Sequence, residues 1–267
     1  KIINDAACIF TRETQTLERM KEAGTTCKIE DIGPDATFAM NLHDEVKAVS
    51  FMKEKKLEPK KFICVVPRLR KTPYYKIYPE WGWTPEHIKE IDDLNEQHAE
   101  TDHAKAREAM TTWIRQTGNK VLICPEMTYQ IDIMNELLVE PLPSDVRELV
   151  EVRDYYWLCD EAATVYKNAF AVLSFECHSP IMSSFNGTPA FYLRQPEDTI
   201  KGEMWYDIGL IDWVFEIEET TGKQISDRLM EVYDDYDRAN QYLEKAMDRV
   251  RAVQQNNFEK IREVFSS

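Results

Sequence analysis

The fold of this chain is decided by the stretch AFAVLSFECHSPIMS, residues 169–183. Its first half, Ala169–Leu173, is a short apolar run that is typical of a buried parallel strand. A turn with Glu176 and His178 follows, then a short predicted helix and a second apolar run at Ala190–Leu193. This order makes a βαβ unit, and ligands of such sheets bind where the strands end. His178 is therefore the first candidate for a catalytic residue.

The composition is that of a globular protein with a sizeable core. The chain has 267 residues, of which 43% are hydrophobic and 11% aromatic. Its net charge of −15 argues against a main role in binding nucleic acid or an anionic membrane, because both need a basic surface. No apolar run approaches the roughly 20 residues of a transmembrane segment.

The six cysteines show no CxxC spacing, and several lie in or beside apolar runs. This pattern favours buried, reduced thiols in a cytoplasmic protein over disulfides or a zinc site. We therefore expect a cytoplasmic location and no metal.

Segments with strand and helix patterns alternate along most of the chain, which predicts an α/β fold of Rossmann-like parallel sheets with flanking helices. Strongly apolar strands are expected at Phe62–Val66 and Val121–Cys124. The C-terminal stretch, without Gly or Pro, predicts one or two long helices. The expected parts are residues 1–42 as the end of an N-terminal Rossmann-like domain, 43–60 as a linker helix, 61–223 as a C-terminal Rossmann-like domain and 224–267 as a C-terminal helical segment.

The segment Arg68–Glu100 is much longer than the 2–6 residues usual for a loop between strand and helix. Flat ring faces stack well on sugar rings and other flat ligands, so the aromatic residues of this segment predict a surface that binds such a ligand, for example an acceptor sugar. The alternative is a loop that folds on its own aromatics and covers the core. The candidate acceptor-binding residues are Tyr74, Tyr75, Trp81 and Trp83, together with Glu126.

Several cations follow predicted strands. Arg68 and Arg70 come after Phe62–Val66, and Arg194 and Lys201 come after the run that ends at Leu193. The carboxyl ends of parallel strands meet at one edge, where these cations could bind a phosphate or carboxylate. The alternative is that each cation pairs with a local acid, such as Glu126, Glu197 or Asp198.

Glu126 also follows a predicted strand, so Glu126, Glu176 and His178 could share one cleft. Imidazole titrates near neutrality, and a neighbouring carboxylate can fix its tautomer and raise its basicity. The alternative is a histidine that only hydrogen-bonds a nearby loop. The sequence has no GxGxxG after a strand, no P-loop, no HExxH and no GxSxG, which argues against nicotinamide chemistry, P-loop phosphoryl transfer, zinc proteolysis and serine hydrolysis.

These features together resemble the polysaccharide pyruvyl transferase family. The resemblance covers most of the chain and depends on the order and spacing of its parts. Those parts are Thr11-Arg12-Glu13 with Thr16-Leu17 and Gly24, the Asp-x-x-Phe element Asp35–Phe38, the strand that ends in Arg68, and Ser174–Gly187 with its His-Ser pair and the Gly-x-Pro after it.

The resemblance implies a GT-B-like architecture of two Rossmann-like domains, with the C-terminal domain complete and the N-terminal domain partial. It also implies transfer of a pyruvyl group from phosphoenolpyruvate to hydroxyls of a saccharide or lipid-linked saccharide, in cell-surface or exopolysaccharide biosynthesis. Phosphoenolpyruvate is then the donor substrate, and no cofactor is needed. By the resemblance His178 is the general acid/base and Arg68 binds the phosphate or carboxylate of the donor. Glu176 is a second candidate catalytic residue, and the other candidate donor-binding residues are Arg70, Arg194, Lys201 and Ser179.

Glu176 departs from the family pattern, which has Arg at this position. A carboxylate there repels phosphoenolpyruvate unless Arg70, Arg194 or Lys201 compensates. Two other hypotheses therefore stay open. One is a GT-B glycosyltransferase with a nucleotide-sugar donor, in which Glu176 contacts the donor sugar and the cations hold the diphosphate. The other is a non-catalytic relative that binds a ligand without turnover. The sequence leaves the oligomeric state open.

Overall fold

The computed structural model describes residues 3–266. A parallel six-stranded sheet forms its centre, with the strand order β5-β4-β3-β6-β7-β8. Counted from β3, this is the Rossmann order 3-2-1-4-5-6, whose switch point lies between β3 and β6. The predicted α/β fold is thereby confirmed. The strands are β3 (Phe62–Val66), β4 (Lys120–Ile123), β5 (Val150–Val152), β6 (Ala171–Ser174), β7 (Ala190–Arg194) and β8 (Val214–Glu216).

Both faces of the sheet are buried, as expected for parallel strands covered by helices. Ile63 and Val65 of β3 belong to a core that includes Trp113, whereas Cys64 belongs to a second core with Phe51. The first core receives side chains from α4 (Pro85–Thr117), α10 (Gly222–Asp234) and α11 (Tyr236–Ser266), and the second from α2 (Glu45–Glu54) and α7 (Cys159–Asn168). Shorter helices complete the layers: α5 (Gln130–Met134), the π-helix η3 (Asn135–Val139), α6 (Ser144–Arg147), α8 (His178–Phe185) and α9 (Met204–Ile208).

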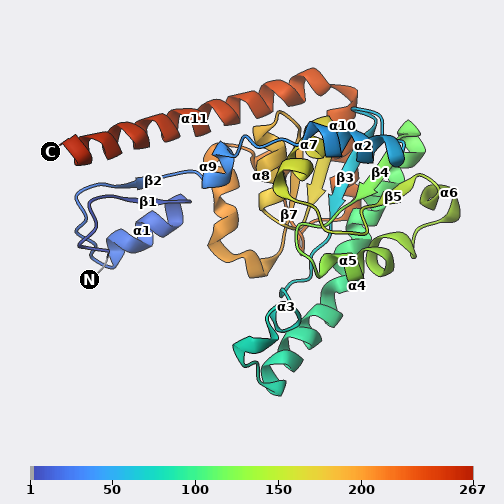
Figure 1. Ribbon diagram of the computed structural model, residues 1–267, viewed down its shortest axis with the longest axis horizontal. Coiled ribbons are helices and arrows are strands. Elements are labelled where there is room, and N and C mark those ends of the chain that lie inside the picture. Colours follow the sequence, from blue (N-terminus) through green and yellow to red (C-terminus); the bar gives the residue numbers. More distant parts are fainter. Residues whose placement is uncertain (1–2, 267) are drawn as a thin grey trace.

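The N-terminal unit, residues 3–43, has a small sheet of its own. β1 (Ile9–Thr11) and β2 (Glu30–Ile32) pair in parallel, with α1 (Thr14–Glu22) between them and the 3₁₀ helix η1 (Ala36–Ala39) after them. Figure 1 shows α11 running from the main sheet back alongside this unit. Asn257 of α11 donates a hydrogen bond to the Ile32 carbonyl at 2.9 Å. Phe38 is fully buried with its ring centroid 6.4 Å from that of Trp205, which anchors η1 to the main body.

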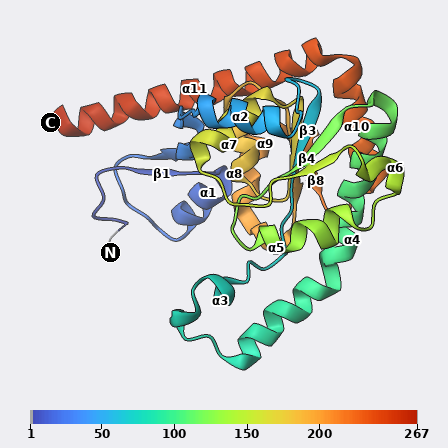
Figure 2. The ribbon, with the colours of Figure 1, turned by 45° about the vertical axis from the view of Figure 1, so that its right-hand side comes forward.

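The predicted long loop after β3 is shorter than expected. Helix α4 already begins at Pro85, with the Thr84 side chain accepting a hydrogen bond from the His87 N–H. Thr at the N-cap followed by Pro is a common helix start, so the loop prediction was wrong from residue 85 onward. The amino half of α4 extends away from the body as an arm, with α3 (Tyr74–Ile77) beside it (Figures 1 and 2).

The C-terminal stretch forms two helices, α10 and α11, separated at Asp235. Between residues 3 and 266, none of the helices combines the length and the apolar content that crossing a bilayer requires.

Candidate functional site

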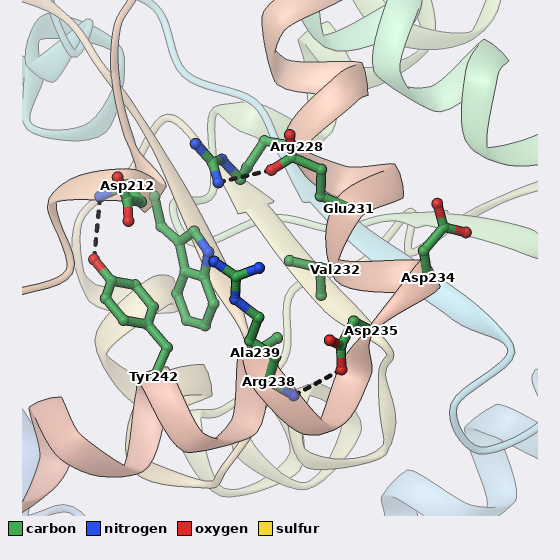
Figure 3. Close-up of a pocket in the computed structure, with 10 residues that line it drawn as sticks. Asp212, Arg228, Glu231, Val232, Asp234, Asp235, Arg238, Ala239 and Tyr242 are labelled. Carbon is green, nitrogen blue, oxygen red and sulfur yellow. Dashed lines mark hydrogen bonds and ion pairs between the residues drawn. The ribbon is translucent and has the colours of Figure 1, made fainter.

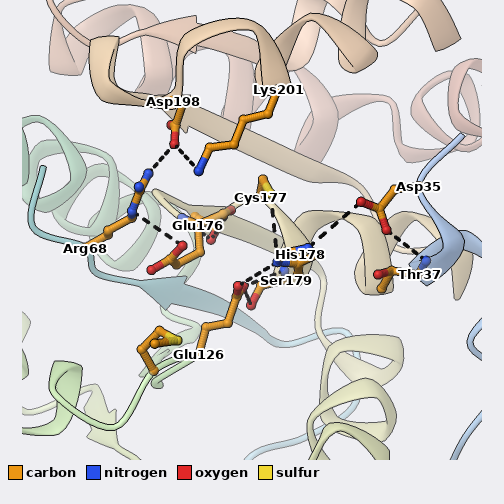
Figure 4. Close-up of polar contacts among 12 residues, drawn as sticks. Asp35, Thr37, Arg68, Glu126, Glu176, Cys177, His178, Ser179, Asp198 and Lys201 are labelled. Carbon is orange, nitrogen blue, oxygen red and sulfur yellow. Dashed lines mark hydrogen bonds and ion pairs between the residues drawn. The ribbon is translucent and has the colours of Figure 1, made fainter. Parts of the chain in front are cut away.

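The carboxyl edge of the sheet brings Arg68 and Glu176 together at the switch point. Val66 and Ser174 are register partners on β3 and β6, so Arg68 and Glu176 leave neighbouring strands at the same level. Arg68 Nε lies 3.5 Å from Glu176 Oε2, and the two residues are only 6% and 8% exposed. The predicted cation and the predicted carboxylate therefore face each other in the structure (Figure 4).

Asp198, which follows β7, holds two of the predicted cations. It is fully buried and forms an ion pair with Arg68. Lys201 Nζ lies 3.0 Å from Asp198 Oδ1, and the Tyr192 hydroxyl donates a hydrogen bond to Oδ2 at 2.6 Å. Although burial opposes it, Arg68 and Lys201 lower the pKa of Asp198. The local-acid alternative thus describes Arg68 and Lys201 correctly, but Lys201 keeps 34% of its side chain exposed.

Glu176 is a buried carboxyl whose pKa is raised. Burial raises its pKa to about 8, the charge of Glu126 adds to the rise, and Arg68 opposes it. Gln130 donates a hydrogen bond to Glu176 Oε1 at 2.8 Å. Burial therefore favours the protonated form of Glu176, which reduces its repulsion of an anionic ligand.

Glu126 caps the amino end of α8. Its Oε2 accepts hydrogen bonds from the backbone N–H and from the hydroxyl of Ser179, both at 2.7 Å. A carboxylate is favoured there because the first N–H groups of a helix lack partners. The Ser179 hydroxyl also lies 3.0 Å from the Tyr166 hydroxyl, and Ser179 is fully buried. Ser179 is therefore held inside the protein.

His178 lies half-exposed beside this cap. Its Nδ1 is 3.3 Å from Glu126 Oε1, and its Nε2 is 4.0 Å from Oδ2 of Asp35 in the N-terminal unit. Hydrogen bonding to Cys177 and to Glu126 raises the pKa of His178 above its ordinary value of 6.5. The imidazole is thus a cation at neutral pH, which suits a proton donor or a charge that stabilises an anion.

No role of its own was predicted for Asp35 from the sequence, although it lies in the Asp35–Phe38 element. It accepts hydrogen bonds from Arg12 Nη1 at 3.0 Å and from the Thr37 N–H at 2.9 Å. Burial opposes ionisation, but the bonds from Thr37 and Arg12 lower the pKa of Asp35. The site therefore includes an ionised carboxylate from a segment about 140 residues before His178. The Asp-x-x-Phe element was the one sequence signal that could have indicated it.

A cavity of about 650 Å³ lies at the same sheet edge, between the body and the arm. Arg70 is fixed in its wall by Asp102, which receives bonds from Nε at 2.9 Å and Nη2 at 3.0 Å, and by Glu218. Cations and aromatic rings thus line one space. The lining residues include Arg68, Arg70, Lys71, Tyr74, Trp83 and Lys201.

Five predicted ligand-binding residues lie outside this lining: Glu126 and Ser179, which bond to each other at α8, and Tyr75, Trp81 and Arg194. Tyr75 donates a hydrogen bond to Asp92 at 2.5 Å. Trp81 stacks on Tyr78 with ring centroids 4.4 Å apart and is 60% exposed on the arm. Arg194 forms ion pairs with Glu216 and Glu203 at 2.7 and 2.8 Å. Their contacts with a ligand stay predictions.

A second cavity, of about 310 Å³, lies near the amino end of β8, away from this edge. Figure 3 shows Asp212, Arg228, Glu231 and Tyr242 around it. Its polar groups pair with each other: Arg228 contacts Glu231 at 2.7 Å, and the Asp212 N–H donates to the Tyr242 hydroxyl at 3.2 Å. Within residues 3–266, no group of three or more His, Cys, Asp or Glu side chains could hold a metal ion.

Comparison with known proteins supports the fold. No protein-family model and no curated protein sequence matches the chain. Among solved structures, the Staphylococcus aureus MnaA–UDP co-structure is similar with a TM-score of 0.55 at 12% identity, covering 98% of this chain and 61% of that one. Anabaena HepE in complex with UDP and glucose gives 0.54 at 9% identity, covering 97% and 64%.

A putative UDP-N-acetylglucosamine 2-epimerase from Listeria monocytogenes is similar as well, with a TM-score of 0.54 at 10% identity. The match covers 96% of this chain and 61% of that one, so the chain spans less than two thirds of these similar structures. The fold is GT-B-like. At these identities the likeness extends to the fold alone.

Proposed function

We propose that this chain forms the donor-binding part of a GT-B glycosyltransferase that uses a nucleotide sugar. The observation that carries the proposal is the cavity at the switch point, which joins Lys201 and Arg68 to the rings of Tyr74 and Trp83. A nucleoside diphosphate offers both a charged group for the cations and a flat base for the rings. UDP is the first nucleotide to test, because two structures of similar fold were solved with it.

The arrangement of charges fits glycosyl transfer to a saccharide acceptor. In that reaction the bond between the anomeric carbon and the phosphate oxygen breaks, and a bond to the acceptor oxygen forms as the acceptor hydroxyl passes its proton to the departing diphosphate. Negative charge then develops on the departing diphosphate. Lys201, whose side chain is 34% exposed and lines the cavity, is the cation placed to stabilise it. His178 lies at the same sheet edge but outside the cavity lining.

The test is calorimetric titration of the protein with UDP, GDP, CMP and phosphoenolpyruvate. We expect UDP to bind, and Lys201→Ala and Trp83→Ala each to weaken binding about tenfold, since each removes one cavity contact worth about 1.4 kcal/mol. Lys76→Ala is the matched control, because Lys76 lies on the arm outside the cavity lining. Equal effects of the test and control variants on affinity would mean that the nucleotide binds outside this cavity. No binding of any of the nucleotides would contradict the proposal.

Pyruvyl transfer from phosphoenolpyruvate is the second candidate, and the protonated state of Glu176 favours it. Because the pKa of Glu176 is about 8, the expected repulsion of phosphoenolpyruvate is weak at pH 7. If this donor is used, its affinity should fall as the pH rises through 8, and Glu176→Gln should remove that decline. If phosphoenolpyruvate binds and none of the nucleotides binds, pyruvyl transfer replaces glycosyl transfer as the proposal. Binding without turnover of any donor would favour a non-catalytic relative.

A further inference from the structure

His178 lies between two carboxylates that come from different parts of the chain. Glu126 faces Nδ1 from the loop after β4, and Asp35 faces Nε2 from the N-terminal unit. Figure 4 shows the ring with a carboxylate on either side. We propose that Asp35 is a positioning residue that, together with Glu126, holds His178 as an imidazolium, so that docking of the N-terminal unit charges the site.

Both carboxylates are held in place by other bonds. Glu126 uses Oε2 for the two bonds from Ser179, which leaves Oε1 facing the ring. Asp35 uses Oδ1 for the Thr37 N–H and Oδ2 for Arg12, and the same Oδ2 faces the ring. Neither carboxylate can turn away from His178 without losing these bonds, so the pairing is preorganised.

The remaining charged or titratable groups around the ring do not cancel the two carboxylates. Arg12 donates a hydrogen bond to Asp35 Oδ2 and so offsets part of the charge of Asp35. The Nε atom of Arg12 also lies 3.6 Å from Glu13, so Arg12 divides its charge between two carboxylates. The Cys177 sulfur lies 3.9 Å from Nδ1. Glu126 and Asp35 therefore face the ring directly, and Arg12, the cation bonded to Asp35, also pairs with Glu13.

The Asp35 side of this arrangement depends on how η1 sits on α8. Phe38, three residues after Asp35, is buried against Trp205 and fixes η1 on the main body. A charged His178 is a proton donor rather than a base in the resting protein. Its use as the acid in transfer rests on the proposed function, whereas the charged state does not.

The test is an NMR titration of His178 in protein with ¹³C-labelled histidine and no ligand, with the signal assigned by His178→Gln. We expect the wild-type midpoint to lie well above 6.5. Asp35→Asn and Glu126→Gln should each lower it by about one unit or more, the usual effect of removing an opposite charge at this range. Asp35→Glu keeps the charge and should restore most of the midpoint.

The matched control is Asp31→Asn, which removes an ion-paired carboxylate of the same unit that pairs with Lys260 instead. It should leave the His178 midpoint unchanged. The signals of His43 and His103 report in the same spectra whether each variant is folded. A wild-type midpoint near 6.5, or an equal response to Asp35→Asn and Asp31→Asn, overturns the proposal. The two proposals can fail separately. If the proposed function is wrong, nucleotides do not bind, but the NMR titration of His178 is unchanged.

Discussion

Two histidines near the same sheet edge have opposite surroundings. His103 of α4 is fully buried, and its ring lies 4.8 Å from that of Phe175. Its Nδ1 is 2.7 Å from the Ala99 carbonyl, and burial lowers its pKa to about 4. His178 has 48% of its side chain exposed and two carboxylates beside it. The first histidine is neutral at pH 7 and the second is charged.

The difference teaches that burial decides whether a nearby acid can charge a histidine. Asp102 precedes His103 in sequence and its charge raises the pKa of His103, but burial outweighs it. Glu126 and Asp35 each keep an oxygen directed at His178. The buried region around α4 therefore contributes stability, whereas the half-open cluster around His178 keeps a charge for a ligand.

The largest effect should come from breaking the buried pair of Arg70 and Asp102. Arg70→Ala leaves the Asp102 carboxylate, in a residue only 2% exposed, without its partner. Removing one member of a buried ion pair usually costs about 3–5 kcal/mol. Urea unfolding should show this loss in the free energy of unfolding, while Lys71→Ala, at the exposed neighbouring position, should stay within about 0.5 kcal/mol of wild type. A loss below about 1 kcal/mol would mean that the pair is not structural.

The buried histidine should produce a smaller, pH-dependent effect. Unfolded histidine takes up a proton near pH 6.5, whereas folded His103 does so only near 4. The unfolded state therefore binds the proton first as the pH falls, and stability is lost between these two values. His103 should account for about 1.6 kcal/mol of the loss between pH 6.5 and 5, because the slope rises to 1.36 kcal/mol per unit only once the unfolded histidine is fully protonated. Urea unfolding at both pH values checks this, because His103→Leu should lack that part of the decline. An unchanged slope would contradict it.

The sequence allowed the fold and the position of the site to be predicted, because both depend on short-range patterns. The stretch 169–193 does form β6, α8 and β7, and Arg68 and Glu176 do meet where β3 and β6 end. The start of α4 was also readable from Thr84 and Pro85, although it was missed. Local spacing decides the helices and strands, and the parallel pairing of β3 with β6 then brings Arg68 and Glu176 together.

Asp198 was among the acids that the sequence suggested, but which acid pairs with which cation could not be predicted, because the pairing depends on tertiary folding. Asp198 reaches Arg68 through η4 (Pro196–Glu203), a 3₁₀ segment that is interrupted at Thr199 with φ of 52°. Asp35 reaches His178 only because η1 packs on the main body through Phe38. Likewise, ring composition alone could not separate Trp83, which lines the cavity, from Trp81, which stacks on the arm.

The smallest effect on stability is expected at His178 itself. Ion pairs of half-exposed groups are worth little, so His178→Gln should change the free energy of unfolding at pH 7 by less than about 1 kcal/mol. Because the pKa of His178 is raised in the fold, its contribution is fully present below about 6.5 and is lost as the pH rises through the folded value. Urea unfolding at pH 6 and pH 9 therefore should show a small difference between wild type and variant that shrinks at the higher pH. A loss as large as that of Arg70→Ala would make His178 a structural residue like His103, and the contrast between the two regions would disappear.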